Sequence, residues 1–334
     1  MHYKLNLKYL SLLVLLLFPL SSFAGNSLLY FEAQGVAGYS TKDDVIYRSA
    51  HSADVMQKNS LGLDYIQKFS GATGDLATLY FQGRLAYNHD HSETQNADKI
   101  QAQLYNAYLK VKTPIANIWG GHNKPTFGLA SYLDNHADLL QPLNMYGLGF
   151  DRDWGVGFNR DFQNGDWALA LTTGSGGRLR TRGNWLITSR ASLGILNVDN
   201  YNLGFSFMGG EMLEVMGYEL MDTEPKQVAL AGIDFAFNHE EFEHKVELDA
   251  GSMADELAWA GFYRLSVNFL EENRLKLEAQ YVGVKNMGQN NNYLGAGVSY
   301  RINSDLTARL MHEWDYRTTE KRFVGQVYWY WNVI

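Results

Sequence analysis

The sequence predicts an all-β fold, a closed antiparallel transmembrane β-barrel of sixteen strands with a long third external loop. Three observations lead to this prediction. Long stretches after residue 24 alternate apolar and polar residues, which is typical of strands with two different faces. Short polar turns alternate with longer connections, as in outer-membrane barrels. The last twelve residues, FVGQVYWYWNVI, are aromatic and uncharged, which suits a strand between lipid and water.

Composition excludes several classes of function. The 334 residues include no Cys, so disulfides, thiolate metal sites and cysteine nucleophiles are excluded. The net charge is −8 and there is no basic tract suited to nucleic acid. Aromatic residues make up 14% of the chain, and long helical stretches rich in Ala, Leu, Glu and Lys are sparse.

The first 24 residues predict a secretory signal peptide. Lys4 and Lys8 precede the apolar run SLLVLLLFPL, and small residues follow at Ser22 and Ala24. The alternative is a membrane anchor, but the apolar run is too short to cross a bilayer comfortably. We therefore expect residues 1–24 to be removed and residues 25–334 to form the outer-membrane barrel.

Alternation is clearest in three segments. The segments 28–39, 259–269 and 294–302 each place apolar residues in one row and polar or small residues in the other, with Val36 as an exception. Such strands are long enough to cross a membrane at a tilt. The sixteen predicted strands span residues 28–41, 60–70, 75–88, 98–112, 115–123, 153–162, 167–175, 183–196, 201–209, 226–238, 242–250, 257–270, 274–285, 292–302, 306–317 and 321–334.

The strand predicted at 98–112 changes phase in its middle. Residues 100, 102 and 104 alternate in one register, and residues 107, 109 and 111 alternate in the other. A β-bulge near Asn106 would reconcile the two halves.

Sixteen strands leave a lumen wide enough for water. The rows expected to face the lumen carry charges of both signs, which only a wet face tolerates in a membrane. A soluble β-sandwich with one solvated face is the alternative, and the strand lengths and the signal peptide argue against it. The expected lumen charges are Glu32, Arg84, Arg190, Asp234, Lys245, Glu247, Asp249, Arg264, Lys276, Glu278, Arg301, Arg309 and Glu313.

The longest connection runs from Lys124 to Asp153 and is the third external loop by count. The segment NAYLKVKTPIANIWGGHNKPTFG, residues 106–128, resembles the strand pair ahead of this loop in outer-membrane general porins, and KPTFGL is also similar to phosphate-selective-type porins. The resemblance implies that the loop folds into the lumen and narrows it, and that the protein is a homotrimer. His122 stands where that family usually has a constriction Arg, so the resemblance does not carry a strong anion preference.

A porin-like channel requires a pore width and a charge pattern at its narrowest point. If the loop lines that point, its candidate groups are Lys124, Asp134, His136 and Asp138, with Arg84, Lys110 and His122 on the opposite wall. The alternative is that these are solvated loop or rim charges.

The segment GGRLRTRG predicts a basic external rim. Arg178, Arg180 and Arg182 fall within five residues and could attract anions or bind lipopolysaccharide phosphates.

Enzymatic and metal-binding interpretations are weak. His239 and His244 in HEEFEH are five residues apart at a predicted turn and strand start, whereas a helical zinc motif needs four. His89 and His91 could trap a metal at the external surface, but a polar loop is the commoner explanation of such a pair. We expect no enzyme activity, no cofactor and no metal.

The C-terminal segment also resembles the assembly signal of outer-membrane barrels, with Gly325, Tyr328 and Tyr330 in place and Ile334 where Phe is usual. Such a signal implies recognition by the barrel assembly machinery. Which row of this strand faces lipid stays open. Val327, Trp329 and Trp331 form the more apolar row, whereas the assembly signal would favour the row of Tyr328, Tyr330 and Ile334.

The sequence therefore predicts a porin-like channel in the outer membrane of a Gram-negative bacterium, for passive diffusion of small hydrophilic solutes or ions. Two alternatives stay open. One is a barrel sheath around a partner such as a periplasmic electron carrier, which would need an open lumen without an inward loop. The other is a surface receptor or adhesion barrel, which would need long external loops.

Overall fold

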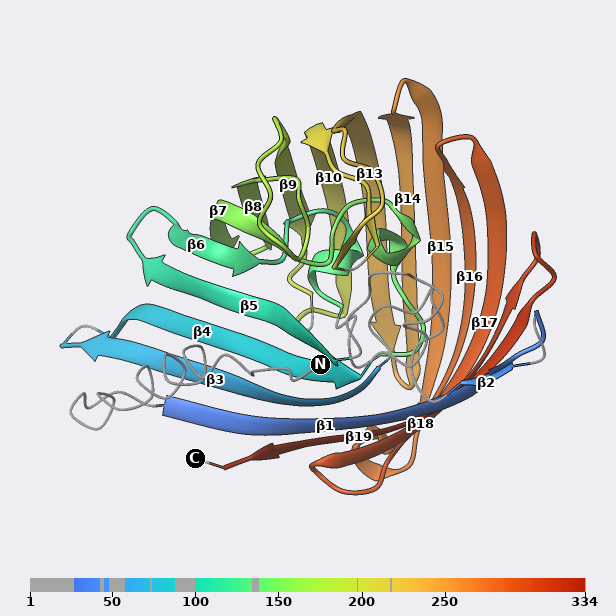
Figure 1. The fold of residues 1–334 in the computed structure, drawn as a ribbon. Helices are drawn as coiled ribbons and strands as arrows, with labels where there is room; N and C mark the ends of the chain where they lie inside the picture. Colours follow the sequence, from blue (N-terminus) through green and yellow to red (C-terminus); the bar gives the residue numbers. More distant parts are fainter. Residues whose placement is uncertain are drawn as a thin grey trace, which may run out of the picture.

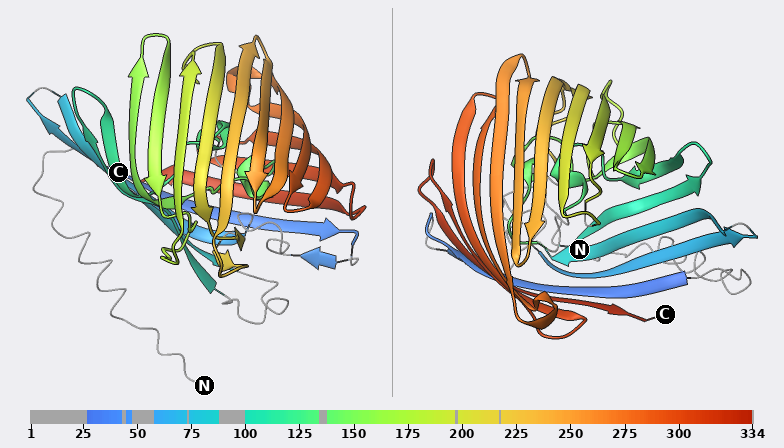
Figure 2. Two further views of the ribbon diagram at one scale, coloured as in Figure 1. Left: turned by 90° about the horizontal axis from the view of Figure 1, so that it is seen from above. Right: turned by 180° about the vertical axis from the view of Figure 1, so that it is seen from behind.

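The computed structural model describes residues 27–42, 45–47, 58–72, 74–87, 100–133, 138–196, 198–216 and 218–333. The predicted signal peptide therefore lies outside the described residues. Sixteen long antiparallel strands form one closed barrel, as the alternation predicted (Figures 1 and 2). Among the described residues, no helix is long and apolar enough to cross a membrane.

The long strands lie within a few residues of their predicted bounds. They are β1 (Ser27–Ser40), β3 (Asn59–Gly71), β4 (Gly74–Tyr87), β5 (Ile100–Lys112), β6 (Asn117–Asn123), β7 (Asp153–Phe162), β8 (Gly165–Thr172), β9 (Trp185–Leu193), β10 (Tyr201–Met212), β13 (Lys226–His239), β14 (Phe242–Met253), β15 (Glu256–Phe269), β16 (Leu275–Asn286), β17 (Gln289–Arg301), β18 (Leu306–Asp315) and β19 (Lys321–Asn332).

Short elements complete the chain, and the alternation did not predict them because they are too short to show a period. They are the strands β2 (Val45–Tyr47), β11 (Val215–Met216) and β12 (Glu219–Leu220), and the 3-10 helices η2 (Leu129–Ser131), η3 (Leu143–Tyr146) and η4 (Glu271–Asn273). β2 pairs with the outer end of β1, beyond the part of β1 that pairs with β3.

The first and last strands close the barrel. β1 pairs antiparallel with β19 from Tyr30 opposite Asn332 to Ser40 opposite Arg322 (Figure 1, blue and dark red). Each strand of the barrel then has a partner on both sides, which a membrane requires because lipid offers no hydrogen bonds to an open edge.

The pairing resolves which row of β19 faces lipid. Val327 and Trp329 are half exposed on the outside, whereas Gln326 is buried and Tyr328 and Tyr330 donate hydrogen bonds to carboxylates of the inner wall. The more apolar row therefore faces lipid. Of the predicted assembly signal, Gly325 is in that outer row, Tyr328 and Tyr330 are in the inner row, and Ile334 lies outside the described residues. Recognition by the assembly machinery stays a prediction.

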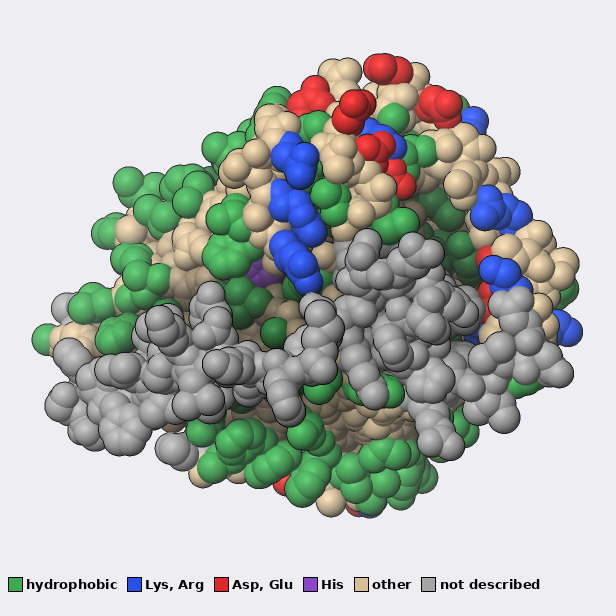
Figure 3. Space-filling view, viewed as in Figure 1, with side chains coloured by type: hydrophobic (Ala, Val, Ile, Leu, Met, Phe, Trp, Pro, Cys, Tyr) green, Lys and Arg blue, Asp and Glu red, His purple; other side chains and the backbone are tan. Residues whose placement is uncertain are grey.

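The two faces of the barrel differ as predicted. Exposed hydrophobic side chains such as Leu61, Phe205, Leu248 and Leu310 cover the outer surface (Figure 3, lower and left edges). The inner rows bury the charged groups that the sequence placed there, including Glu32, Arg84, Arg190, Asp234, Glu247, Asp249, Arg264 and Glu313.

A bulge in β5 accounts for its change of phase. Gln82 of β4 pairs with Asn106 and Gly83 pairs with Leu104, so Tyr105 is the extra residue. Tyr105 and Asn106 are consecutive and both buried, which shifts the inward row from odd to even positions. The predicted bulge is confirmed.

Gly121 on β6 should tolerate no side chain. Its φ is +131°, and a Cβ there would overlap the carbonyl oxygen of Ala107 on β5. We expect Gly121→Ala to lower the free energy of unfolding by about 2 kcal/mol or more, because backbone strain and overlap add. Urea unfolding in detergent micelles measures this. Gly120→Ala is the matched control, because the nearest atom to its Cβ is a Val156 methyl at 3.8 Å. Equal effects of the two substitutions would contradict the conclusion that the backbone at Gly121 excludes a side chain.

Candidate functional site

The described parts of the third external loop, residues 124–133 and 138–152, lie inside the barrel (Figures 1 and 2, green). Backbone N–H groups in its first half donate hydrogen bonds to side chains of the inner wall. The N–H of Thr126 donates to Thr188 Oγ1 at 3.1 Å, that of Gly128 to Ser206 Oγ at 3.0 Å, and that of Leu129 to Glu247 Oε2 at 3.0 Å. These acceptors come from β9, β10 and β14, so three strands hold the start of the loop.

The second half of the loop forms hydrogen bonds with strands β15, β16 and β18 of the wall. Arg264 of β15 donates to the Leu140 carbonyl at 2.7 Å, and Gln280 of β16 donates to the Gln141 carbonyl at 2.9 Å. Tyr146 Oη donates to Glu313 of β18 at 3.2 Å. The loop is therefore attached along one side of the lumen, from β9 to β18.

Apolar contacts strengthen this attachment. A buried cluster joins loop residues to inward-facing residues of β9, β10 and β13–β16, where both rows of the strands are apolar. Burial of each large apolar side chain stabilises the folded state by roughly 1.5–3 kcal/mol. The loop members are Phe127, Leu129, Leu143 and Leu148, and the wall members include Leu186, Met208, Leu230 and Phe262.

A second, smaller cluster holds the tip of the loop. Leu139 and Leu140 pack with Val36, Met311 and Val324. Val36 thus breaks the alternation of β1 because it faces the loop instead of water.

Arg190 of β9 is the best-connected charge of the lumen. Its side chain is fully buried and bonds Asp234 twice, at 2.9 and 2.6 Å. It also donates to Tyr132 Oη of the loop at 3.0 Å, and that hydroxyl donates to Asp166 at 3.2 Å. Burial raises the pKa of Tyr132 to about 12, so the hydroxyl keeps its proton and can donate. This network ties the loop to β8, β9 and β13.

The loop leaves space on the other side of the lumen. A cavity of about 560 Å³ lies between the loop and the wall, with polar lining on the loop side and polar and aromatic lining on the wall side. Lys124, Ser131, Asp138 and Arg152 line it from the loop, and its other lining residues are Asp64, Tyr80, Gln82, Asn106, Tyr108, Asn123, Arg309, Tyr328 and Tyr330.

The predicted constriction residues fall in different places. Lys124 and Asp138 line the same cavity, and Lys110 lines a neighbouring space of about 300 Å³ together with Lys124 and Asp166. Asp134 and His136 lie outside the described residues.

Two further candidates lie away from the cavity. Arg84 is buried in the wall, where it donates to Gln103, Gln34 and Ser60. His122 is fully buried beside Trp154, with ring centroids 4.8 Å apart. Neither side chain lines either of these two cavities, whereas Arg152 and Arg309 line the larger one, and the sequence reasoning did not select those two as constriction residues. Arg309 was expected only as a general lumen charge.

The three predicted rim arginines lie in the loop between β8 and β9. Arg178 and Arg182 are exposed, in keeping with the basic side chains on the face in view of Figure 3. Arg180 instead donates to the carbonyls of Ser175 and Tyr218, and so links two external loops.

Asp153, the first residue of β7, organises the same loop. Its carboxylate accepts hydrogen bonds from the N–H groups of Gly174, Ser175 and Gly176 at 2.6 to 3.2 Å. The sequence reasoning used Asp153 only as a loop boundary, since the glycine-rich partner segment lies twenty residues away.

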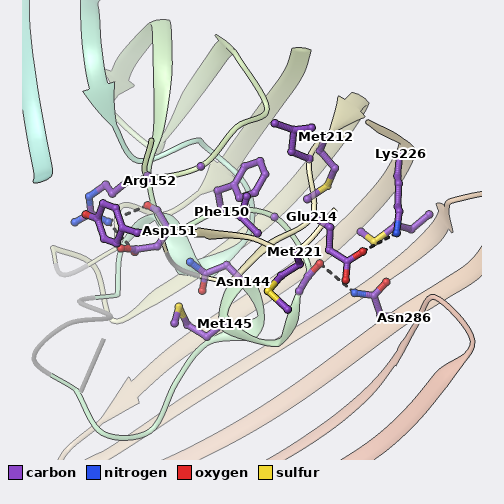
Figure 4. Close-up of a pocket in the computed structure, with 18 of the residues that line it drawn as sticks. Asn144, Met145, Phe150, Asp151, Arg152, Met212, Glu214, Met221, Lys226 and Asn286 are labelled. Atoms are coloured by element: carbon purple, nitrogen blue, oxygen red, sulfur yellow. Dashed lines mark hydrogen bonds and ion pairs between the residues drawn. The ribbon is translucent and has the colours of Figure 1, made fainter. Parts of the chain in front are cut away.

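A third cavity, of about 350 Å³, opens at the external mouth (Figure 4). It lies between the lumen loop and the loops after β8 and β10, and Lys226 and Glu214 form an ion pair of 2.6 Å at its edge. Asn286 donates to the Gly147 carbonyl at 3.2 Å in its lining. Five methionines come together here from segments far apart in the sequence, so no local motif predicted them. They are Met145, Met212, Met221, Met253 and Met287.

The histidines considered for metal binding have other surroundings. His239 stacks with Phe237, and His244 is tilted against the same ring, with its Nδ1 2.9 Å from Tyr263 Oη. His89 and His91 lie outside the described residues. In the described part of the chain, no group of three or more His, Asp or Glu side chains is placed to hold a metal ion.

Comparison with known proteins rests on structure. No protein-family model matches the sequence, and no curated protein sequence is significantly similar to it. The loop L8 deletion mutant of OmpT, an outer membrane protein of Vibrio cholerae, is 12% identical with a TM-score of 0.63 over 92% of this chain and 100% of its own.

Two porin structures match equally well. Salmonella typhi OmpF, in a complex with daunomycin, is 10% identical with a TM-score of 0.63 over 92% of this chain and 98% of its own. An anion-selective porin from Comamonas acidovorans is 9% identical with a TM-score of 0.63 over 92% of this chain and 100% of its own. At these identities the similarity establishes the fold, and this chain has the closed sixteen-stranded β-barrel fold of the porins.

Proposed function

We propose that this protein is an outer-membrane channel of a Gram-negative bacterium, through which small hydrophilic solutes or ions diffuse passively. One observation carries the proposal: the described parts of the loop at 124–152 are fixed inside the barrel, beside a polar cavity of about 560 Å³. A fixed loop sets the width and the charge pattern of a pore, which is what passive selectivity needs. A channel of this kind requires no enzyme activity and no cofactor.

The alternatives fit less well. A sheath around a partner protein needs an open lumen, whereas the loop occupies much of this one. A receptor needs long external loops, whereas β14 joins β15 and β16 joins β17 through two residues each. The inward loop therefore favours the channel.

Export and assembly follow the sequence and the fold. We propose that residues 1–24 direct secretion and are removed, and that the barrel assembly machinery inserts the barrel among lipid and lipopolysaccharide. An OmpT structure of Vibrio cholerae with a TM-score of 0.62 is described in a trimer form, which supports a homotrimer here. Arg178 and Arg182 on the external rim suit anionic solutes or lipopolysaccharide phosphates.

The charges of the passage predict weak ion preference. Lys124, Arg152 and Arg309 line the cavity together with Asp64 and Asp138, so charges of both signs are present in nearly equal number. Single channels in planar bilayers should therefore show stepwise conductance with a small reversal potential in a salt gradient. Folded protein without conductance steps would contradict the channel.

Neutralising the loop carboxylates should shift this preference. For Asp134→Asn with Asp138→Asn we expect the anion-to-cation permeability ratio to rise about two-fold, because Asp138 lines the cavity and the loop loses two negative charges. Reversal potentials measure the ratio. Glu240→Gln, at an exposed turn, removes one charge away from the passage and should leave it unchanged. An unchanged ratio in the double variant would place these carboxylates away from the ion path.

A further inference from the structure

The lumen wall that faces the loop carries a row of aromatic side chains, here called the aromatic band. The band crosses six neighbouring strands, from β19 through β1, β3, β4 and β5 to β6. Its members are Tyr328 and Tyr330 of β19, Tyr30 of β1, Tyr80 of β4, Tyr108 of β5 and Trp119 of β6.

The rings of the band are in contact in two groups. Tyr30 and Tyr330 stack with centroids 4.8 Å apart and planes at 7°, and Tyr328 continues this stack at 6.3 Å and 8°. Tyr80 and Tyr108 stack at 5.4 Å and 1°, and Trp119 meets Tyr108 edge-on at 6.4 Å. Each ring is thus held in place by its neighbours.

Asp64 of β3 joins the two groups. Its Oδ2 accepts hydrogen bonds from Tyr80 Oη at 2.9 Å and from Tyr330 Oη at 2.8 Å. The carboxylate is buried between them, so it fixes both hydroxyls and makes the two stacks one continuous surface.

The band faces water, not lipid. Tyr80 continues the inward row of Gln82, and Tyr328 and Tyr330 continue that of Gln326. Four of the rings line the 560 Å³ cavity opposite Lys124 and Asp138 of the loop. Aromatic girdles on the outside of barrels anchor them at the membrane boundary. That explanation does not apply to rings in the lumen.

Hydrogen-bonding groups border the band. Asn106 donates to Gln82 at 2.7 Å and accepts from Arg152 at 3.1 Å. Arg309 donates to Gln326 at 2.9 Å and lies over the Tyr328 ring at 5.3 Å. The border therefore offers amides and guanidinium groups in fixed positions beside the rings.

The opposite wall has a different chemistry. On β13–β16, toward the turns at 240–241 and 270–274, the inward residues include charged groups and amides, namely Asp234, Glu243, Lys245, Arg264, Asn268, Lys276 and Gln280. Cross-strand ring pairs would stabilise the sheet on any strand. Because the rings gather on the wall beside the passage, we expect them to contact the solute.

Rings beside fixed polar groups match the surface of a sugar. One face of a pyranose carries C–H groups with partial positive charge, which suit the negative face of an aromatic ring. Its hydroxyls both donate and accept, as the amides and guanidinium groups on the border require. We propose that the aromatic band is a binding track for short pyranose oligosaccharides. This proposal rests on the channel function and specifies its solute class.

The test is current block in planar bilayers, with maltotriose as the probe. We expect maltotriose to reduce the single-channel current in a concentration-dependent, saturable way. Poly(ethylene glycol) of the same mass should reduce it much less at equal concentration, because it has no rigid ring with a C–H face and carries hydroxyl donors only at its two ends. Tyr80→Leu with Tyr108→Leu should raise the half-blocking concentration of maltotriose about ten-fold, since base-to-ring and similar stacking contacts contribute on this scale.

Control variants separate the possible outcomes. Tyr281→Leu removes a tyrosine from the lipid face and should leave the block unchanged. Tyr80→Phe with Tyr330→Phe keeps both rings and removes their hydrogen bonds to Asp64. This variant should weaken the maltotriose block several-fold, and it replaces the leucine variant if that variant does not fold.

Each result bears on one proposal. Absence of conductance would remove the channel function itself. Normal conductance without maltotriose block, block by the polymer to the same extent, or full block in the folded band variants would overturn the binding track while the channel stands.

Discussion

Replacing residues 125–151 by a four-residue Gly-Ser linker is expected to raise single-channel conductance about two- to three-fold, because the loop occupies much of the cross-section that a sixteen-stranded barrel offers to water. A short linker can close the gap, since Asn123 and Asp153 are paired neighbours on β6 and β7. The step size of the conductance in planar bilayers measures the change. The variant should also lose its discrimination between small and large neutral polymers.

The matched control shortens an external loop instead. Removing Val215–Leu220, the hairpin of β11 and β12, alters the rim and leaves the loop in the lumen, so the step size should change little. The mobility of the unheated barrel in detergent gels confirms folding of both variants. Equal step sizes for the lumen-loop variant and the natural chain would mean that this loop does not limit the passage.

Arg190→Met is expected to lower the free energy of unfolding by about 3–5 kcal/mol, because it leaves buried carboxylates without their cation. Arg190 bonds Asp234 twice, lies 3.7 Å from Asp166 and donates to Tyr132 of the loop. The same change should loosen the loop and add noise to the open-channel current. Urea unfolding in micelles, followed by tryptophan fluorescence, measures the first effect, and current recordings measure the second.

Two comparisons make this prediction specific. Lys112→Met breaks a pair with Asp75 of 3.6 Å in which the lysine is 50% exposed, and should cost less than about 1 kcal/mol. Arg190→Met combined with Asp234→Leu should regain part of the loss, since an apolar pair replaces a buried ion pair. A single Arg190→Met variant as stable as Lys112→Met would contradict the structural role of this cation.

The sequence was sufficient to predict the strands because lipid imposes a strict rule on them. Every residue of a membrane strand faces either lipid or the lumen, so the period of two persists over ten or more residues. The change of phase at Asn106 could be assigned to a bulge for the same reason. The facing of β19 could not be decided, because both of its rows are aromatic and only the register with β1 distinguishes them.

The course of the lumen loop was harder to predict. Its anchors, such as Ser206, Glu247 and Arg264, lie far along the chain, and only the closed register brings them together. A signal was nevertheless present. Val36 and Leu230 place apolar side chains in inward rows, which water would not favour, and both are buried by the loop or its cluster. Apolar residues in a lumen row thus indicate where a loop docks.

The aromatic band and the methionine-lined cavity show the same limit. Tyr30, Tyr80 and Tyr330 are spread over 300 residues, and no local spacing links them. They meet because β1 lies between β19 and β3 in the closed sheet.

The anchoring of the lumen loop also sets an order of events during assembly. Its partners are separated from it by 118 residues at Glu247, 124 at Arg264 and 167 at Glu313. Contacts that span such long stretches of chain form late, because the intervening segment must first be ordered. The loop can settle fully only after β18 and β19 have joined the sheet. A newly closed barrel should therefore pass through a wide, leaky stage before it matures into the narrow pore.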